Sequence, residues 1–349
     1  MAGPPVVSIV VAALNEVASI RSCLEALGSQ TYPHDQLEII VSDGMSNDGT
    51  REIVLEMGAR DPRIHLVDNV RRITPTAWNS GLLASHGSIV GIMSGHGEPR
   101  LDYVERCVDV LARHEASAVG GRIERTAGSI EQQAVAFVTS SPFGVGDAAH
   151  NYSLEPGPAE TVFPGMWPRS VLERVGLFDE ELVRNQDDEL SFRIREAGLL
   201  IWYDPAIVVR YHPRGSAGAL FRQYQQYATW KVRVYQKHPR AVRPRQLVPP
   251  AWVAVMTIGV VATPFVPWAL GITGLTLGAY LAVMSIAVLR MPGRPVPAWR
   301  VLRAFLALHL GYGIGMWVGV VRFAPGWLGR RQGATPTRLP KIEEAGPKS

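Results

Sequence analysis

Residues 251–289 contain no Asp, Glu, Lys, Arg or His. Such a run is long enough for two membrane spans of about 20 residues each, and the sequence TPFVPW near its middle provides a turn between them. A second apolar stretch, residues 304–321, contains His309 but no Asp, Glu, Lys or Arg, and it is at the short limit for a third span. Three such segments in succession after a region of mixed polarity are typical of a membrane domain rather than of buried core helices.

We therefore expect a soluble domain over residues 1–240, a membrane domain over residues 241–322 and a flexible Pro/Gly-rich tail over residues 323–349. The expected spans are 251–269, 271–289 and 304–321.

The net charge of +4 is concentrated beside the apolar segments. Residues 231–245 have six Lys or Arg and no acid, and residues 290–303 have four Arg. The positive-inside rule places both segments on the cytoplasmic side. Basic clusters can also bind nucleic acid, but their position beside apolar spans argues against a nucleic-acid partner. The tail from Arg322 onward is also basic, which conflicts with three full crossings.

The N-terminal sequence MAGPPVVSIVVAALNE has no charged n-region and reaches Asn-Glu too soon for a secretory signal peptide. The chain has only two cysteines, Cys23 and Cys107, too few for a disulfide framework. We therefore expect a multi-pass protein of the inner (plasma) membrane whose soluble domain is cytoplasmic.

The soluble domain alternates strand-like and helix-like segments. Continuous apolar runs such as VVSIVVAAL (6–14) are typical of buried parallel strands, and amphipathic segments follow them. This alternation predicts an α/β fold, a Rossmann-like and mostly parallel sheet with crossover helices. No GxGxxG follows the first strand, which disfavours an ordinary dinucleotide site.

Two acidic turns stand at expected strand-to-helix junctions. In VSDGMSNDGT, Asp43, Ser46 and Asp48 crowd the start of a helix, where they can act as helix caps or accept hydrogen bonds from a base or a ribose. In NQDDELSFRI, Asp187 begins an acidic cluster in the first turn of another helix. The helix dipole favours acids there, but it explains the whole cluster less well.

These segments in this order resemble the family 2 glycosyltransferases of GT-A fold. The resemblance rests on VVSIVVAALNEVASIRSCLEALGSQTYP, EIIVSDGMSNDGT, FDEELVRNQDDELSFRIREAG and IWYDPAIVVRYHPR. More narrowly, SSPFGVGDA, TVFPGMWPR, RNQDDELSFRI and the membrane segments are similar to the succinoglycan-biosynthesis (ExoA) type of membrane-anchored bacterial enzyme. The resemblance covers residues 6–240, with a membrane region similar in kind.

The resemblance implies an inverting transfer of a sugar from a nucleotide-diphosphate sugar to an acceptor hydroxyl. Asp187 stands at the family's general-base position, with Gln186 in place of a Glu, and one positioned carboxylate suffices for inversion. The donor nucleotide is expected to contact residues of three loops that follow strands. These residues are Asn15, Glu16, Asp43, Ser46, Asp48, Arg72 and Asn79.

The family's metal-binding Asp-x-Asp falls on the turn SGHGE, where the nearest relatives have Asp-x-His. His96 matches a ligand position, and Ser94 replaces the first Asp. In an extended segment residues 94, 96 and 98 project from the same side, so Glu98 can supply a carboxylate. Alternatively, Gly97 and Pro99 turn the chain and leave Glu98 in solvent. The expected cofactor is a divalent metal, Mn²⁺ or Mg²⁺.

The family's processive members carry Gln-x-x-Arg-Trp, whereas this chain has Gln226 and Trp230 with Thr229 in the Arg position. This departure weakens a claim of processive synthesis. Trp230 either shapes an acceptor pocket together with Gln226 or is an aromatic residue at the membrane interface.

We expect a glycosyltransferase that extends a lipid-linked or surface-polysaccharide acceptor at the cytosolic membrane face. The alternative is a catalytically silent homologue that binds nucleotide sugar or scaffolds polysaccharide assembly. Ser94 favours this alternative, and the retention of Asp187 opposes it. A transporter is disfavoured because three short spans leave too little protein for a substrate pathway.

Overall fold

The computed structural model describes residues 3–146, 151–290 and 296–328, together with Thr337 and Leu339. Two compact units make up the chain. The sheet unit comprises residues 1–125, 148–212 and 334–349, and the helical unit comprises residues 126–147 and 213–333. The domain border expected at residue 240 stays a prediction, and the compact units divide the chain at other places.

The first half of the sheet is parallel. Its strands are β1 (Val7–Ala13), β2 (Leu37–Asp43), β3 (Ile64–Asp68) and β4 (Ile89–Ser94). They lie in the order β3-β2-β1-β4, and every neighbouring pair is parallel. β1 is central and almost wholly buried, which explains its continuous apolar sequence.

The second half of the sheet mixes strand directions. The order continues with β8 (Met166–Pro168), β6 (Ala118–Arg125), β9 (Ile201–Tyr211) and β5 (Glu98–Pro99), while β7 (Gly157–Pro158) also pairs with β9. β8 runs antiparallel to both of its neighbours, and β6 and β9 are parallel to each other. The predicted α/β class with a mostly parallel sheet is confirmed. The short strands β5, β7 and β8 form the antiparallel pairs of this sheet.

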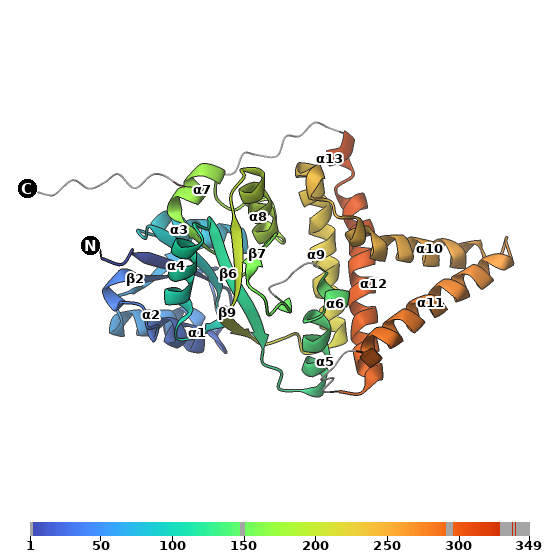
Figure 1. Cartoon of the computed structure of the whole chain (residues 1–349), viewed down its shortest axis with the longest axis horizontal. Coiled ribbons are helices and arrows are strands. Elements are labelled where there is room, and N and C mark those ends of the chain that lie inside the picture. Colours follow the sequence, from blue (N-terminus) through green and yellow to red (C-terminus); the bar gives the residue numbers. More distant parts are fainter. Residues whose placement is uncertain (1–2, 147–150, 291–295, 329–336, 338, 340–349) are drawn as a thin grey trace, which may run out of the picture. The chain divides into compact units, whose positions relative to one another are not determined.

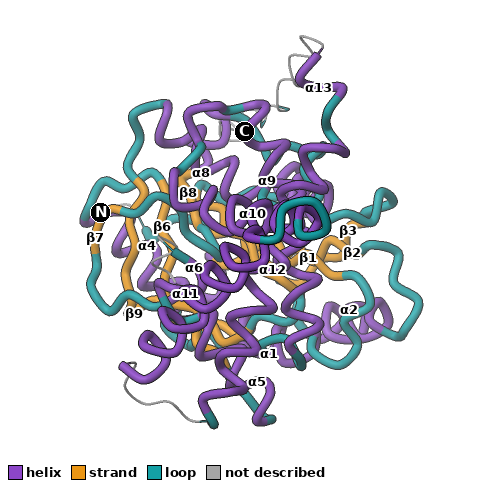
Figure 2. Tube along the Cα trace, turned by 90° about the vertical axis from the view of Figure 1, so that its right-hand side faces the viewer, coloured by secondary structure: helices purple, strands orange, loops and turns teal. Residues whose placement is uncertain are grey.

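Helices cover both faces of the sheet, as its two apolar clusters show; Figure 2 draws the helices in purple and the strands in orange. α1 (Ile20–Gly28), α2 (Thr50–Arg60) and α4 (Tyr103–Arg113) share one apolar cluster with Ile9 and Val11 of β1. On the other face, Val10 of β1 belongs to a second cluster with three helices. These are α3 (Thr74–Ala84), α7 (Arg169–Val175) and α8 (Gln186–Glu196).

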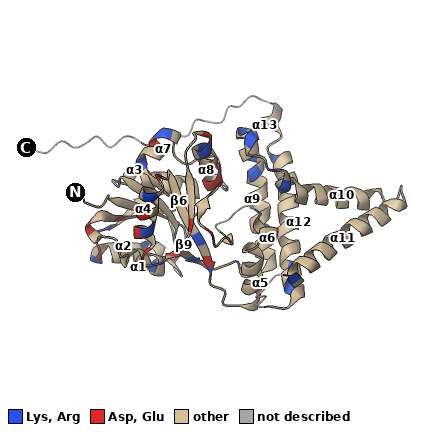
Figure 3. Ribbon diagram, viewed as in Figure 1, with Lys and Arg blue, Asp and Glu red and all other residues tan. Residues whose placement is uncertain are grey.

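The helical unit contains three helices that are long and apolar enough to cross a membrane, judged by length and composition. Among the described residues these candidate spans are Pro244–Ala262, which ends with α10 (Val248–Ala262), then α11 (Trp268–Arg290) and α12 (Ala298–Arg322). Figure 3 shows α10 and α11 without acidic or basic side chains over nearly their whole length. The turn between them falls on the expected TPFVPW sequence, so the first apolar helix ends earlier than the predicted 251–269 span.

The other helices of this unit are α5 (Ile130–Thr139), α6 (Pro142–Val145), α9 (Ala217–Lys237) and α13 (Pro325–Leu328). Short 3₁₀ turns η3 (Pro239–Ala241) and η4 (Pro244–Leu247) connect α9 to α10, and η1 (His34–Gln36) precedes β2 in the sheet unit. α9 and α12 lie side by side along much of their length (Figure 1).

Candidate functional site

The carboxyl ends of three adjacent parallel strands bring the predicted donor and metal residues together. β1 lies between β2 and β4, with Ala13 opposite Asp43 and Ala12 opposite Ser94. Ligands of open α/β sheets bind beyond these strand ends. The loop after β1 therefore stands between two turns, which we call the nucleoside turn (residues 43–50, after β2) and the histidine turn (residues 94–98, after β4).

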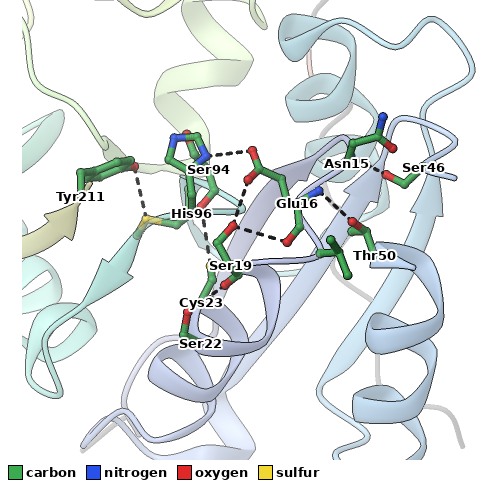
Figure 4. A network of polar contacts seen from close by, with 12 residues as sticks. Asn15, Glu16, Ser19, Ser22, Cys23, Ser46, Thr50, Ser94, His96 and Tyr211 are labelled. Carbon is green, nitrogen blue, oxygen red and sulfur yellow. Dashed lines mark hydrogen bonds and ion pairs between the residues drawn. The ribbon is translucent and has the colours of Figure 1, made fainter. Parts of the chain in front are cut away.

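Three backbone N–H groups of the loop after β1 donate hydrogen bonds to the nucleoside turn. The backbone N–H of Asn15 donates to Ser46 Oγ at 2.9 Å, that of Glu16 to Thr50 Oγ1 at 2.7 Å, and that of Val17 to an oxygen of Asp48 at 3.1 Å. Figure 4 shows the Asn15–Ser46 and Glu16–Thr50 contacts. The two loops thus form one rigid edge.

Backbone strain accompanies this edge. Asn15 and Met45 both have positive φ angles of 56°. Such conformations are uncommon for residues other than glycine and often mark functional loops when the surrounding contacts hold them. Asn15 is also fixed through its side chain, because its Oδ1 accepts a hydrogen bond from the N–H of Asn47 at 3.1 Å.

The carboxylate of Asp43 is fully buried and already has partners. One oxygen accepts from the Ser46 hydroxyl at 2.5 Å, and the other accepts from the Ser46 N–H at 3.0 Å. Arg51 lies 3.4 Å from Asp43 and 2.7 Å from Asp68, so one guanidinium serves two acids at adjacent strand ends. Sequence reasoning missed Arg51, although its place in the first turn of the helix after Asp43 was a usable signal.

Asp48 accepts hydrogen bonds from the first residue of α2 and from the loop after β1, while Gly49 is the N-cap residue of α2. The hydroxyl of Thr50 donates to Asp48 at 2.6 Å, and the backbone N–H groups of Thr50 and Val17 also donate to it. These hydrogen bonds, led by that of the Thr50 hydroxyl, hold the pKa of Asp48 below its ordinary value. The capping interpretation of Asp48 is wrong, because Gly49 is the N-cap residue; the role of Asp48 in donor binding stays a prediction.

The histidine turn faces the loop after β1 from the other side (Figure 4). Nδ1 of His96 lies 2.8 Å from Oε1 of Glu16, and Ser19 donates to the other Glu16 oxygen at 2.9 Å. The His96 side chain is 43% exposed, so its ring is accessible, while that of Glu16 is 25% exposed. Sequence reasoning placed Glu16 in the donor pocket and missed its contact with His96.

Glu98, the carboxylate expected beside His96, occupies β5, where it pairs with Arg210 of β9. The structure gives no hydrogen bond between Glu98 and His96, although Glu98 is partly buried rather than fully in solvent. Both Glu98 and Glu16 lie near Cys23: burial raises the pKa of this thiol to about 12, and the two carboxylates add smaller contributions. Ser94 takes part through its carbonyl oxygen, 3.6 Å from the Cys23 sulfur.

The contact with Glu16 fixes the chemistry that His96 can offer. When Nδ1–H donates to the carboxylate, Nε2 keeps its lone pair and can bind a metal ion, the usual carboxylate–histidine–metal arrangement. Over the described residues, no group of three or more His, Cys, Asp or Glu side chains is placed to hold a metal ion. Nε2 of His96 is therefore the candidate ligand of this turn, and a divalent ion there would need most of its other ligands from outside the described residues.

The third predicted donor segment follows β3 and begins α3. Arg72 has a positive φ of 58° and is exposed. Asn79 is 2% exposed, and its amide donates to the carbonyl of Phe178 and to Glu180, both at 2.9 Å. Arg71 forms an ion pair with the same Glu180. Asn79 thus fixes the segment that leads to α8, and the contact of Arg72 with the donor stays a prediction.

The three acids in the first turn of α8 differ in burial and in their contacts. Glu189 is 1% exposed and forms two hydrogen bonds, of 2.8 and 2.9 Å, with Arg193. Arg193 in turn donates to the backbone carbonyls of residues 175–177, so Glu189 is structural. Asp187 and Asp188 are partly exposed, as a proton acceptor requires.

The cap of α8 shows the same combination of strain and polar burial as the nucleoside turn. Asn185 caps the helix with a positive φ of 61°. Next to it, Gln186 is 5% exposed, and its Oε1 has no hydrogen-bond partner among the described residues. Asn185 and Gln186 directly precede Asp187.

The two acceptor candidates lie on α9 of the helical unit. Gln226 is exposed. The ring of Trp230 lies 5.3 Å from that of Phe323, and the guanidinium of Arg322 lies 5.1 Å from its centroid. These contacts hold the ring of Trp230 against the end of α12 and leave both interpretations of this residue open. Its acceptor role stays a prediction.

The chain is similar to proteins of known kinds. Residues 8–144 match the sequence model described as Glycosyl transferase family 2. The succinoglycan biosynthesis protein ExoA of Rhizobium meliloti (strain 1021) is 29% identical over 331 residues, which cover 90% of this chain and 95% of that protein. A dolichyl N-acetyl-alpha-D-glucosaminyl phosphate 3-beta-D-2,3-diacetamido-2,3-dideoxy-beta-D-glucuronosyltransferase of Methanococcus voltae is 26% identical over 239 residues, covering 66% of this chain and 74% of that protein.

Among solved structures, the mannosyltransferase PcManGT from Pyrobaculum calidifontis, in complex with GDP-Man and Mn²⁺, aligns with a TM-score of 0.58 at 22% identity. The alignment covers 89% of this chain and 88% of that one. At this identity the likeness concerns the fold, and the predicted GT-A fold is confirmed.

Proposed function

Because the chain carries a glycosyltransferase family 2 domain, we propose that it is an inverting enzyme that uses a nucleotide-diphosphate sugar. The sugar goes to a hydroxyl of a lipid-linked or surface-polysaccharide acceptor at the cytosolic membrane face. The observation that carries this proposal is the convergence of Asp43, Glu16 and His96 at the ends of three adjacent strands.

The nucleoside turn and the loop after β1 bind the nucleoside. Asn15, Glu16, Asp43, Ser46 and Asp48 shape this edge, and Asp43 faces the base. Because Asp43 and Asp48 already accept several hydrogen bonds, they act mainly by holding the edge in place. Arg72 is exposed beside it and neutralises the diphosphate, while Asn79 positions the loop before α8.

Nε2 of His96 would hold a divalent metal, Mn²⁺ or Mg²⁺, together with the donor diphosphate, with Glu98 and Ser94 close by in the same turn. Such an ion would supply positive charge that stabilises the leaving diphosphate. Imidazole suits Mn²⁺ better than Mg²⁺, which prefers oxygen ligands. The complex of PcManGT with GDP-Man and Mn²⁺ supports this assignment.

Asp187 is the general base. It takes the proton of the acceptor hydroxyl while the hydroxyl oxygen attacks C1 of the sugar from the face opposite the diphosphate. The bond between C1 and the diphosphate oxygen breaks, and the diphosphate leaves with the electron pair. A single displacement inverts C1 and needs no second carboxylate, which agrees with the structural use of Glu189.

Membrane attachment suits an amphiphilic acceptor. α10 and α11 present apolar side chains outward, among them Phe265 in their turn at 82% exposure. The basic segments 231–245 and 290–303 flank this hairpin, which favours a cytoplasmic position for both. Gln226 and Trp230 lie on α9 just before the first basic segment, where an acceptor at the membrane surface is within reach.

The test uses the full chain purified in detergent. We expect one nucleotide sugar from a panel to raise the melting temperature in the presence of Mn²⁺, because a ligand of the native state stabilises it. That donor should release its nucleoside diphosphate when membrane lipid extract is added. If none of the panel either stabilises the protein or is consumed, the proposal fails.

The second candidate function is a catalytically silent nucleotide-sugar-binding or scaffolding homologue. Ser94, in the place of the family's first metal-binding Asp, favours it. Stabilisation by a nucleotide sugar without turnover in any lipid extract would support this candidate over the enzyme.

A further inference from the structure

The C-terminal tail returns to the sheet unit. The carbonyl of Thr337 accepts a hydrogen bond from the N–H of Leu177 at 2.8 Å. Leu339 is 2% exposed and belongs to the apolar cluster that contains Leu172 and Phe178. The tail and the sheet unit therefore lie on the same side of any membrane. The chain between them must cross an even number of times, although three of its helices have the length and composition of a span.

The first half of α12 packs on a segment that cannot cross a membrane. Phe305 and Leu308 of α12 form an apolar cluster with Val135 and Val138 of α5. α5 has ten residues and thus a length of about 15 Å, half the thickness of a bilayer core. In sequence it lies between β6 and β8 of the sheet unit, so it stays on the side of that unit.

Polar contacts fix this arrangement at both ends of the α5–α6 segment. Glu131 of α5 forms ion pairs with Arg300 and Arg303 at the start of α12, the latter at 3.1 Å. Nε2 of His309 lies 3.0 Å from the carbonyl oxygen of Phe143 in α6. The first three turns of α12 are therefore held at the depth of α5 and α6.

The second half of α12 packs on α9 through glycines spaced four residues apart. A Cβ at Gly311, Gly315 or Gly319 would lie 2.5, 2.3 or 2.5 Å from a backbone carbonyl oxygen of α9. The oxygens belong to Phe221, Gln225 and Thr229, which are also spaced by four, so the two helices run parallel in close contact. The Thr229 hydroxyl also donates to the Gly315 carbonyl at 3.0 Å.

α9 is not a membrane span. Its 21 residues include four Lys or Arg, which are costly in hydrocarbon. These are Arg222, Lys231, Arg233 and Lys237. Because α12 follows α9 over the Gly311–Gly319 stretch, it lies at the same depth as α9 rather than across the bilayer.

We propose that α12 does not cross the membrane but lies along its surface, and that only the α10–α11 hairpin enters the bilayer. The side of α12 away from α9 and α5 meets the hairpin, where Trp317 donates to the carbonyl of Pro250 at 2.9 Å. Between its basic ends α12 exposes apolar side chains, such as Val318 at 42% and Val321 at 75%, as expected of a helix in the interface. Basic residues stand at both ends, Arg300 and Arg322 among them, which agrees with one side for both ends.

The test compares the two ends of α12 by labelling with a membrane-impermeant maleimide. Pro297→Cys and Ala324→Cys place exposed thiols at its start and end. Leu101→Cys, at a residue 60% exposed in the sheet unit, marks the side of that unit, and Phe265→Cys marks the hairpin tip. The natural Cys23 and Cys107 are fully buried, and the unmodified chain measures their background. Intact cells and inside-out vesicles are labelled in parallel.

We expect residues 297, 324 and 101 to label from one side and residue 265 from the other. Labelling of 297 and 324 from opposite sides would overturn the proposal. That this shared side is the cytoplasm rests on the proposed function. The experiment tests the position of α12 separately from the cytoplasmic orientation. If 297, 324 and 101 all label from outside, α12 lies on the surface as proposed, and the cytosolic orientation of the enzyme is wrong.

Discussion

The nucleoside turn and the histidine turn flank the loop after β1, and they use their polar groups in opposite ways. In the nucleoside turn, Asp43 and Asp48 accept hydrogen bonds from the loops around them. In the histidine turn, Glu16 fixes one nitrogen of His96 and leaves the other accessible. The nucleoside turn is thus a scaffold held in shape by its own contacts. The histidine turn presents one atom, Nε2 of His96, that can bind a ligand.

The difference teaches that an acid in a motif is not automatically a ligand. Asp43 is fully buried, whereas the His96 side chain is 43% exposed. Substitutions in the nucleoside turn should therefore act mainly on stability and donor affinity. Substitutions in the histidine turn should act on the metal requirement.

The largest effect should come from a residue outside both turns. Asp187→Asn keeps the shape of the side chain but removes the proton acceptor. We expect turnover to fall by about 10²–10⁴-fold, the usual contribution of a general base. Donor affinity and the Mn²⁺ requirement should stay near those of the unaltered protein, because neither turn is touched. Steady-state turnover and donor titration by thermal shift measure the two parts.

Asp188→Asn is the matched control for this prediction, since it removes a neighbouring charge from the same helical turn. It should retain most of the turnover. Equal losses in both variants would show that the charge of the turn matters rather than one base. An unchanged Asp187→Asn would transfer the base to Asp188, because Glu189 is bound to Arg193.

Much of the fold could be predicted from the sequence because local patterns determine it. The apolar run of β1 predicts a buried parallel strand, and the TPFVPW turn predicts the break between α10 and α11. The short strands β5, β7 and β8 could not be predicted, because two or three residues have no period and depend on the neighbouring strands.

The sites divide in the same way. The sequence brought Asp43, Glu16 and His96 to one edge, because the carboxyl ends of parallel strands meet there. It could not give the pairing of His96 with Glu16, which are 80 residues apart, nor the Arg51 contact with Asp43. Such contacts depend on side-chain directions in the folded chain, which strand order alone does not determine.

The second prediction concerns the atom presented by the histidine turn. His96→Ala removes the only imidazole of the turn, so the Mn²⁺ concentration needed for half-maximal activity should rise by more than about 10-fold. Glu98→Ala should raise it less, since Glu98 forms no hydrogen bond with His96 in the structure. Ser94→Asp should lower it by adding a carboxylate. Mn²⁺ should act at lower concentration than Mg²⁺.

Full activity in EDTA, with His96→Ala indistinguishable from the unaltered protein, would break the comparison between the turns. The exposed Arg72 and its neighbour Arg71 would then neutralise the leaving diphosphate.

The third prediction separates the two functions assigned to Glu16. Glu16→Ala removes the acceptor for His96 Nδ1, so the ring can turn and change tautomer. We expect Mn²⁺ affinity to fall by about 10–100-fold, as for other residues that orient a metal ligand. Glu16→Gln keeps an acceptor oxygen and should lose less. Binding of Mn²⁺ in the presence of a nucleoside diphosphate, followed by electron paramagnetic resonance, measures this without turnover.

The control is the affinity of each variant for nucleoside diphosphate in EDTA, where no metal is bound. If Glu16→Ala weakens that binding as strongly as it weakens Mn²⁺ binding, Glu16 acts on the nucleoside and the turns are not separate. If neither changes, the contact with His96 has no role in metal binding.

The smallest effect should appear in the nucleoside turn, as a change in stability with pH. The hydrogen bonds from Thr50 and Val17 lower the pKa of Asp48 in the folded protein from its ordinary 3.8. A carboxyl group with a lowered folded pKa stabilises the fold above its unfolded pKa, and this contribution is lost as the pH falls through the folded value. Asp48→Asn should therefore melt lower than the unaltered protein at pH 7, and the difference should shrink as the pH falls below about 4.

Melting temperatures of both proteins between pH 7 and pH 3 measure this, with Asp35→Asn as a control at an exposed acid in η1. The control should show a smaller difference at pH 7. A difference for Asp48→Asn that stays constant over the whole range would mean that the substitution acts through lost packing and not through the charge. The nucleoside turn would then owe its rigidity to the neutral hydrogen bonds of Asn15, Ser46 and Thr50, and the two turns would differ less than their contacts indicate.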